Sequence, residues 1–234
     1  MLAIAATDEW RTTHPGATIG LLELSGIDNT AASARLDERK RDIEARLRER
    51  YRGFTRRELL ALPVLAAYDR YYRRFNKTYH LQLQVESIVL KGKALPTVSP
   101  AVDANFMAEV ETLVLTAGHD GAKLGGSILI DVSRDGDQMT QMSGGSRAIR
   151  AGDMVMRDAD DIACSIIYGQ DARSPIGAAT TRILYVAYAP AGVPADAIDD
   201  QLRRIQEHVR LFAAEASVEQ HRLLTATPEP PAKL

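Results

Sequence analysis

The chain has 234 residues, of which 45% are hydrophobic and 26% are charged, and its net charge is −2 at pH 7. This composition is that of an ordinary globular protein, long enough to bury a full core. The near-neutral charge excludes a global attraction to nucleic acid or acidic lipid, so any such partner must meet a local patch.

Targeting and metal signals are absent from the sequence. Cys164 is the single cysteine and cannot form an intramolecular disulfide, which favours a reducing compartment. The apolar start of the chain meets Asp8 and Glu9 too early for a secretory signal, and no apolar run approaches the roughly 18 residues of a membrane span. The five histidines show no metal-ligand spacing with each other or with Cys164. We therefore expect a soluble, cytoplasmic protein with no membrane partner, no metal and no cofactor.

An apolar run over 18–24 predicts a first short strand. The dipeptide Asn29-Thr30 is expected to stop this strand and to cap the helix that follows.

Positive charge is concentrated in residues 35–77, which hold 14 Lys and Arg against 7 Asp and Glu. Apolar spacing predicts two helices here, separated by Gly53, and the second helix is expected to start at Thr55 and to run through Tyr68. Two interpretations stay open. The helices present a solvated face held by pairs such as Asp42 with Arg46, or they form a footprint for a phosphate backbone. In the second interpretation, the phosphate contacts come from Arg70, Arg73, Arg74 and Lys77, and the bases stack on Tyr71, Tyr72, Phe75 and Tyr79.

The remaining pattern predicts a single mixed α/β (α+β) domain over 1–222, with helices packed on a partly antiparallel sheet. Residues 83–90 fit a helix or a strand equally well. A helix over 103–115 is expected to pass into a polar loop ending at Asp120. Strands are predicted over 127–132, 152–156, 162–168 and 182–188, with a turn at 134–137. An amphipathic helix is expected over 194–217, and a disordered tail over 223–234.

Four segments, read in order, carry a resemblance to a known family. They are Val102 to Asp120, Gly-Gly-Ser-Ile-Leu-Ile-Asp-Val (125–132), Ala-Gly-Asp-Met-Val-Met-Arg-Asp (151–158) and Ala-Thr-Thr-Arg-Ile-Leu-Tyr-Val (179–186). Together they resemble the B3/B4 domain of the phenylalanyl-tRNA synthetase β subunit, which hydrolyses misacylated tRNA. The resemblance covers about residues 50–190. Free-standing members of the family add an N-terminal strand and helix, which suits residues 1–50, and a C-terminal helix, which suits 194–217.

Candidate site residues lie in the expected helix and loop over 103–120 and in the expected loop over 168–181. The family's editing histidine falls on Ala117 and its editing glutamate falls near Ala187, so no synthetase catalytic residue is carried over. His119 and Asp120 are instead the candidate catalytic pair, with His119 as a base or a water-positioning group. A surface His-Asp pair is the open alternative. The candidate substrate-binding residues are Asn105, Glu111, Thr116, Asp171 and Thr181, although an ion pair between Asp171 and Arg173 that only pins a loop is a second interpretation.

Two functions follow from the resemblance and the residues. The first is a free-standing aminoacyl-tRNA deacylase, an ester hydrolase that clears mischarged tRNA in trans. The second is a non-catalytic module that binds RNA, an amino acid or a small metabolite. The partners implied are tRNA or aminoacyl-tRNA and a small amino-acid-like ligand.

Overall fold

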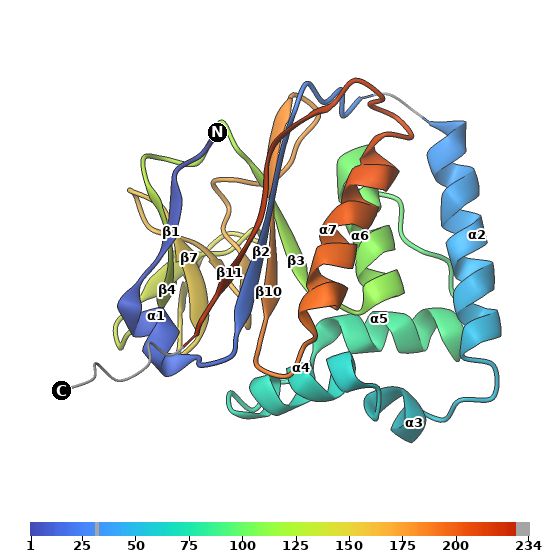
Figure 1. Ribbon diagram of the computed structural model, residues 1–234, viewed down its shortest axis with the longest axis horizontal. Coiled ribbons are helices and arrows are strands. Elements are labelled where there is room, and N and C mark those ends of the chain that lie inside the picture. Colours follow the sequence, from blue (N-terminus) through green and yellow to red (C-terminus); the bar gives the residue numbers. More distant parts are fainter. Residues whose placement is uncertain (31–32, 228–234) are drawn as a thin grey trace.

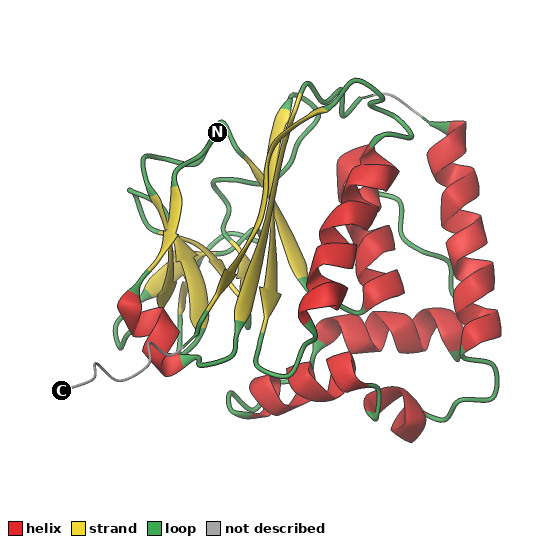
Figure 2. Ribbon diagram, in the orientation of Figure 1, coloured by secondary structure: helices red, strands yellow, loops and turns green. Residues whose placement is uncertain are grey.

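Two β-sheets and a layer of helices lie side by side in the computed structural model, which describes residues 1–30 and 33–227 (Figures 1 and 2). A five-stranded sheet forms one outer layer. A four-stranded sheet lies in the middle, and most of the helices cover its other face. The expected mixed α/β fold is confirmed.

The middle sheet has the order β11-β2-β10-β3 and is antiparallel throughout. Its two central strands are β2 (Thr18–Ser25) and β10 (Arg182–Ala189). Both are buried along almost their whole length, because the second sheet covers one face and helices cover the other. A strand buried on both faces reads as a continuous apolar run, which is why these two were predictable.

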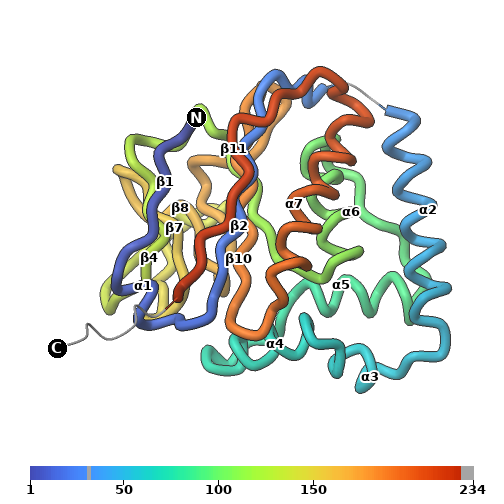
Figure 3. Tube along the Cα trace, in the orientation of Figure 1, coloured from blue at the N-terminus to red at the C-terminus, as the bar shows by residue number. Residues whose placement is uncertain are grey.

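The two edge strands, β3 (Thr116–Asp120) and β11 (Ser217–Thr225), correct the sequence prediction. Residues 116–120 are not a polar loop, because they pair with 183–187 of β10. The C-terminal helix ends at Val209 rather than near 217, and 223–225 continue β11 beside β2 instead of starting a tail (Figure 3). Residues 228–234 of the predicted tail lie outside the described residues.

The outer sheet has the order β1-β4-β7-β8-β9, in which only the β1–β4 pair is parallel. Its strands are β1 (Ile4–Ala6), β4 (Ile128–Val132), β7 (Met154–Arg157), β8 (Ile162–Ser165) and β9 (Gly169–Gln170). A separate hairpin pairs β5 (Gln138–Thr140) with β6 (Ser146–Ala148). The strands predicted over 127–132 and 152–156 are therefore confirmed, whereas the strand predicted over 162–168 ends at Ser165. They do not pack on the 103–115 helix as one sheet, because the middle sheet adjoins that helix.

Seven helices complete the described chain. They are α1 (Asp8–Thr13), α2 (Ala34–Arg50), α3 (Arg56–Leu60), α4 (Pro63–Arg73), α5 (His80–Val89), α6 (Pro100–Thr112) and α7 (Ala195–Val209). The ambiguous 83–90 segment belongs to helix α5.

Two helix starts differ from the prediction. The N-cap of α2 is Ser33, whose side chain accepts from Leu36 N, and not Asn29. The Asn29 side chain instead accepts from Ala101 N at 2.9 Å, in the first turn of α6. The second basic helix is two helices, because Thr55 starts α3 with a capping box and Pro63 then occupies the first turn of α4.

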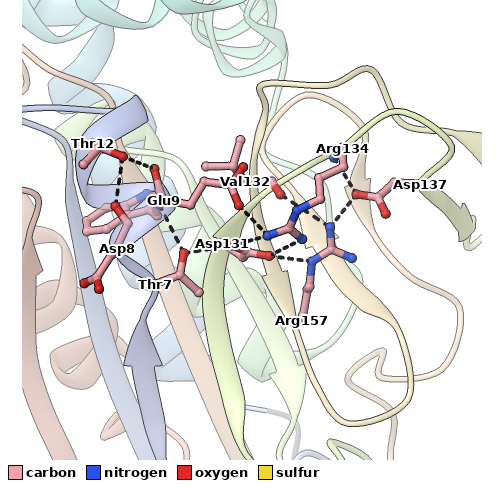
Figure 4. A network of polar contacts seen from close by, with 10 residues as sticks. Thr7, Asp8, Glu9, Thr12, Asp131, Val132, Arg134, Asp137 and Arg157 are labelled. Atoms are coloured by element: carbon pink, nitrogen blue, oxygen red, sulfur yellow. Dashed lines mark hydrogen bonds and ion pairs between the residues drawn. The ribbon is translucent and has the colours of Figure 1, made fainter.

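A polar network around Asp131 of β4 fastens α1 to the outer sheet (Figure 4). Thr7, the N-cap of α1, donates from its hydroxyl to Asp131 at 2.8 Å. Arg134 and Arg157 each donate to the same carboxylate at 2.9 Å. Charge-assisted bonds of this kind are stronger than neutral ones. They fix where α1 begins, and hence where His14 lies at its end.

Tyrosines on α4 join the two sheets. The Tyr68 hydroxyl donates to Tyr188 O of β10 at 2.7 Å and accepts from Leu115 N at 2.9 Å. One turn later, the Tyr71 hydroxyl donates to Asp153 at 2.6 Å, just before β7. All four aromatic side chains expected to stack on RNA bases, Tyr71, Tyr72, Phe75 and Tyr79, are buried in the core. That stacking hypothesis is therefore wrong, because Tyr71 packs against Phe75 and Tyr72 packs against Tyr79 inside the core.

No helix in the described ranges is both long and apolar enough to cross a bilayer.

Replacing Tyr68 with Phe removes one hydroxyl and leaves a buried carbonyl and a buried N–H without their partner. Such loss costs about 1–3 kcal/mol per unsatisfied group. We expect Tyr68→Phe to lower the free energy of unfolding by about 2 kcal/mol or more in urea titrations. Tyr51→Phe is the matched control, because the Tyr51 hydroxyl is buried without a partner among the described residues. Equal stabilities for the two variants would show that the Tyr68 hydroxyl does not hold the layers together.

Candidate functional site

A cavity of about 240 Å³ lies between α6, β3 and the β8–β9 segment, and we call it the α6 cavity. Helix α6 contributes Val102, Asn105 and Glu109 to its lining. These residues are spaced by three and four, so they form one stripe on the helix. The site is thus built from a single helix face and the strands opposite it.

Glu109 is the only acidic residue in the lining of this cavity. Its Oε1 accepts a hydrogen bond from Thr116 N at 2.7 Å, which ties α6 to the start of β3. Within residues 1–30 and 33–227, no basic side chain pairs with it. Burial raises the pKa of the Glu109 carboxyl to about 8, against the opposing effect of the Thr116 hydrogen bond. The carboxyl is therefore largely protonated at neutral pH.

Asn105 lies one helical turn before Glu109 and offers a second acceptor. Its Nδ2 donates to Thr116 O at 2.9 Å, whereas its buried Oδ1 has no partner in the described part of the chain. The Thr116 hydroxyl accepts from Gln201 of α7 at 2.9 Å. Much of the remaining wall is apolar, from Val102, Leu115, Ile166, Ile176 and Tyr188. This arrangement suits a small cation that carries an apolar group.

His119 lies outside this lining and is fully buried. Its Nδ1 is 2.8 Å from Ser174 Oγ and 3.2 Å from the amide nitrogen of Gln170, and Ser174 in turn donates to Asp171 at 2.7 Å. Burial lowers the pKa of His119 to about 3, so it is neutral and weakly basic at pH 7. Serine stands between histidine and aspartate, which is not the order of a nucleophilic triad. Gln170, which lines the cavity, is the link between this buried group and the site.

Asp120 and Asp171 fix the conformation of the loops in which their partners lie. Asp120 accepts from Ala122 N at 3.1 Å and from the Thr180 hydroxyl at 2.8 Å. Thr181 is exposed, and the threonine that bonds Asp120 is its neighbour Thr180. Asp171 pairs with Arg173 at 2.8 Å, the ion pair expected in the second interpretation of Asp171.

Glu111 points away from the α6 cavity. Its carboxylate lies 3.1 Å from Arg46 of α2, 3.1 Å from Arg204 and 2.9 Å from His208 of α7. It therefore joins three helices. Of the candidate substrate-binding residues, only Asn105 and Thr116 line the cavity. Glu109 was missed, although its place on the stripe with Val102 and Asn105 is a signal that the sequence contains.

The four basic residues predicted to bind RNA are exposed at the end of α4 and just beyond it. Arg73 pairs with Asp69 at 2.9 Å across one helical turn. Arg70 and Arg74 line a second cavity instead. Arg73 is thus ion-paired, whereas Arg70 and Arg74 border a cavity.

The family model described as B3/4 domain matches residues 66–212, more than half of the chain. Among solved structures, the protein is similar to the crystal structure of an N-terminal fragment of the phenylalanyl-tRNA synthetase β-subunit from Pyrococcus horikoshii, at 6% sequence identity and a TM-score of 0.47. That similarity covers 95% of this chain and 50% of the other, so this protein spans about half the length of the fragment. A search of curated proteins finds no match.

The raised pKa of Glu109 makes stability depend on pH. Above the ordinary value of 4.5 the unfolded chain has lost this proton, whereas the folded protein keeps it up to about pH 8. The folded state therefore binds more protons in this window, and the contribution of Glu109 to the free energy of unfolding falls as pH rises. We expect Glu109→Gln to gain about 2 kcal/mol relative to wild type between pH 5.5 and pH 7.5.

Urea unfolding of both proteins at each pH measures this gain. Asp135→Asn removes an exposed carboxylate and is the control, for which no such gain is expected. A constant difference between Glu109→Gln and wild type across the range would mean that Glu109 is ionised in the folded protein at pH 5.5.

Proposed function

The chain belongs to the B3/4 domain family, and from that premise we propose that it binds the aminoacyl group of a charged tRNA in the α6 cavity. One observation carries the proposal. The buried Glu109 carboxyl lines the cavity and has no cationic partner among the described residues. The resemblance of the sequence to the synthetase editing domain supports a ligand attached to tRNA.

The chemistry of the cavity fits an amino acid. An isolated carboxylate is costly to bury, so Glu109 stays protonated while the cavity is empty. An α-ammonium group supplies the missing cation, and the unpartnered Oδ1 of Asn105 accepts one of its protons. Pockets for drug-sized ligands measure about 300–1,000 Å³. At about 240 Å³, this cavity suits one amino-acid residue with an apolar side chain rather than a nucleotide.

Hydrolysis of the ester is the second candidate function, and the pKa of Glu109 favours it. A carboxyl with a pKa of about 8 lies close to the operating pH expected of a general acid and base. In this proposal ionised Glu109 takes a proton from a water molecule, and the oxygen of that water attacks the ester carbonyl. The ribose oxygen leaves with that proton, which gives a free amino acid and uncharged tRNA. Asn105 then holds the ammonium group alone, and His119, Asp120 and Asp171 support the loops around the site.

Binding is tested with amide-linked aminoacyl-adenosine analogues of apolar amino acids, titrated calorimetrically. We expect Glu109→Gln to weaken binding by about 10–100-fold, the value of one charge-assisted hydrogen bond. N-acetylation of the analogue removes the positive charge and should weaken binding to wild type by a similar factor, but leave binding to Glu109→Gln unchanged. Asp135→Asn is the protein control. An N-acetyl analogue that binds wild type as tightly as the free amine would refute recognition of the ammonium group by Glu109.

Deacylation is tested on a panel of mischarged tRNAs. If Glu109 is the acid and base, Glu109→Gln should lower kcat by about a hundredfold or more with little change in KM. If Glu109 only holds the ammonium group, KM rises instead. No release of amino acid from any member of the panel would leave a binding module and rule out the hydrolase.

A further inference from the structure

A second cavity, of about 220 Å³, lies between the end of α1 and the outer face of α4, and we call it the α4 cavity. Arg70, Arg74 and His14 line it, together with the turn that follows β10. No acidic residue belongs to its lining. The hollow is therefore positively charged in a protein whose net charge is −2.

Neither arginine in this cavity pairs with a carboxylate among the described residues. The third arginine of α4, Arg73, does pair, with Asp69 at 2.9 Å. Arg70 and Arg74 are four residues apart, so two like charges occupy one helix face and repel each other. Cations near a helix C-terminus interact favourably with the helix dipole, which accounts for the position of Arg70 and Arg74 along α4. The dipole does not account for the cavity that the two arginines line. An anion in the cavity would relieve the repulsion.

Each guanidinium group lies close to a neighbouring residue. The Arg74 Cζ lies 5.3 Å from the centre of the Tyr71 ring and 5.7 Å from that of Phe75. Arg70 lies against Gly192, where a Cβ atom would come within 2.7 Å of its Nη2. These contacts place both exposed side chains at the rim of the cavity, where a ligand can reach them.

His14 adds a third polar group. It is 5% exposed, and its Nε2 is buried without a hydrogen-bond partner in the described ranges. Burial, followed by the charge of Arg74, lowers the pKa of His14 to about 4, so the ring is neutral at pH 7 and carries one N–H. An unsatisfied buried group of this kind is stabilised when a ligand oxygen accepts its proton.

We propose that the α4 cavity binds a phosphate group through Arg70, Arg74 and His14. Guanidinium groups match the geometry of phosphate oxygens and donate to them in pairs. Three donors from two elements suit a tetrahedral oxyanion better than a planar carboxylate. The phosphate comes from a small metabolite or from a nucleic acid, and the chemistry of recognition is the same for both. This site is independent of the α6 cavity and of the function proposed for it.

The test is a calorimetric titration at pH 7 and low salt with inorganic phosphate and with AMP. Wild type is expected to bind at least one of them with a Kd of ~1 mM or tighter. Arg70→Ala and Arg74→Ala should each weaken binding by about tenfold or more. Arg73→Ala is the matched control, because it removes the same charge from the same helix outside the cavity, and its affinity should stay within about twofold of wild type. Circular dichroism melting checks that each variant remains folded.

The source of the phosphate is separated by measuring tRNA binding against salt concentration. If the phosphate belongs to RNA, Arg70→Ala and Arg74→Ala each reduce the log–log slope by about one unit and Arg73→Ala does not. If the ligand is a small phosphate, tRNA binding is insensitive to all three changes while AMP or phosphate binding still depends on Arg70 and Arg74. Absence of saturable phosphate binding by wild type, or an Arg73→Ala variant as weak as Arg70→Ala, would overturn the proposal.

Discussion

Hydrogen bonds from the tyrosine hydroxyls of α4 hold the layers of this protein in register. Tyr68 reaches the middle sheet at Tyr188 O and Leu115 N, and Tyr71 and Tyr72 reach the outer sheet at Asp153 and Ile166 O. Each hydroxyl is buried, so each bond lies where an unpaired polar group would be costly. Both candidate cavities depend on this helix. Leu115, whose N–H donates to Tyr68, and Ile166, whose carbonyl accepts from Tyr72, both line the α6 cavity. Arg70 and Arg74 line the α4 cavity beside Tyr71.

Each of the two cavities contains ionisable side chains that have no partner of opposite charge, acidic in one cavity and basic in the other. The α6 cavity contains a buried acid that no basic side chain pairs with, since burial lowers the pKa of His80, the one histidine in its described lining. The α4 cavity contains two arginines, and its described lining has no acid. Elsewhere in the described chain, most buried carboxylates pair with a basic side chain, as Asp103 with Lys40 at 2.7 Å and Glu23 with Arg182. Asp153 is instead held by hydrogen bonds from Tyr71 and Ser165. Buried charges are normally compensated within the protein, so exceptions at cavities point to compensation by a ligand.

The sequence predicts the strands that are covered on both faces. It does not predict the edge strands, whose conformation depends on pairing with a neighbouring strand. Strands β2 and β10 are continuous apolar runs because they are covered on both faces. Strand β11 is an edge strand with polar residues such as Gln220, whose amide donates to Glu23, so no apolar alternation marks it. Strand β3 contains Gly118, His119 and Asp120, a composition typical of a loop, and only its pairing with β10 makes it a strand.

Only part of the candidate site could be predicted, because the rest depends on contacts between segments. Helical spacing places Asn105 and Glu109 on one face of α6. Which face of α6 lines a cavity is decided by β3, which follows the helix after a turn, and by β8, which is distant in sequence. Glu111, a candidate substrate-binding residue, faces α2 and α7, where Arg46 and Arg204 pair with it.

The account rests on Glu109 being protonated in the empty cavity and ionised when an ammonium group is bound. Carbon-13 NMR of glutamate side-chain carboxyls, titrated with and without an amide-linked aminoacyl-adenosine analogue and assigned with Glu109→Gln, measures this directly. The account predicts a pKa of about 8 for the free protein and a clear fall when the analogue binds. A Glu109 pKa near the ordinary value of 4.5 in the free protein, or one that the analogue leaves unchanged, would contradict it.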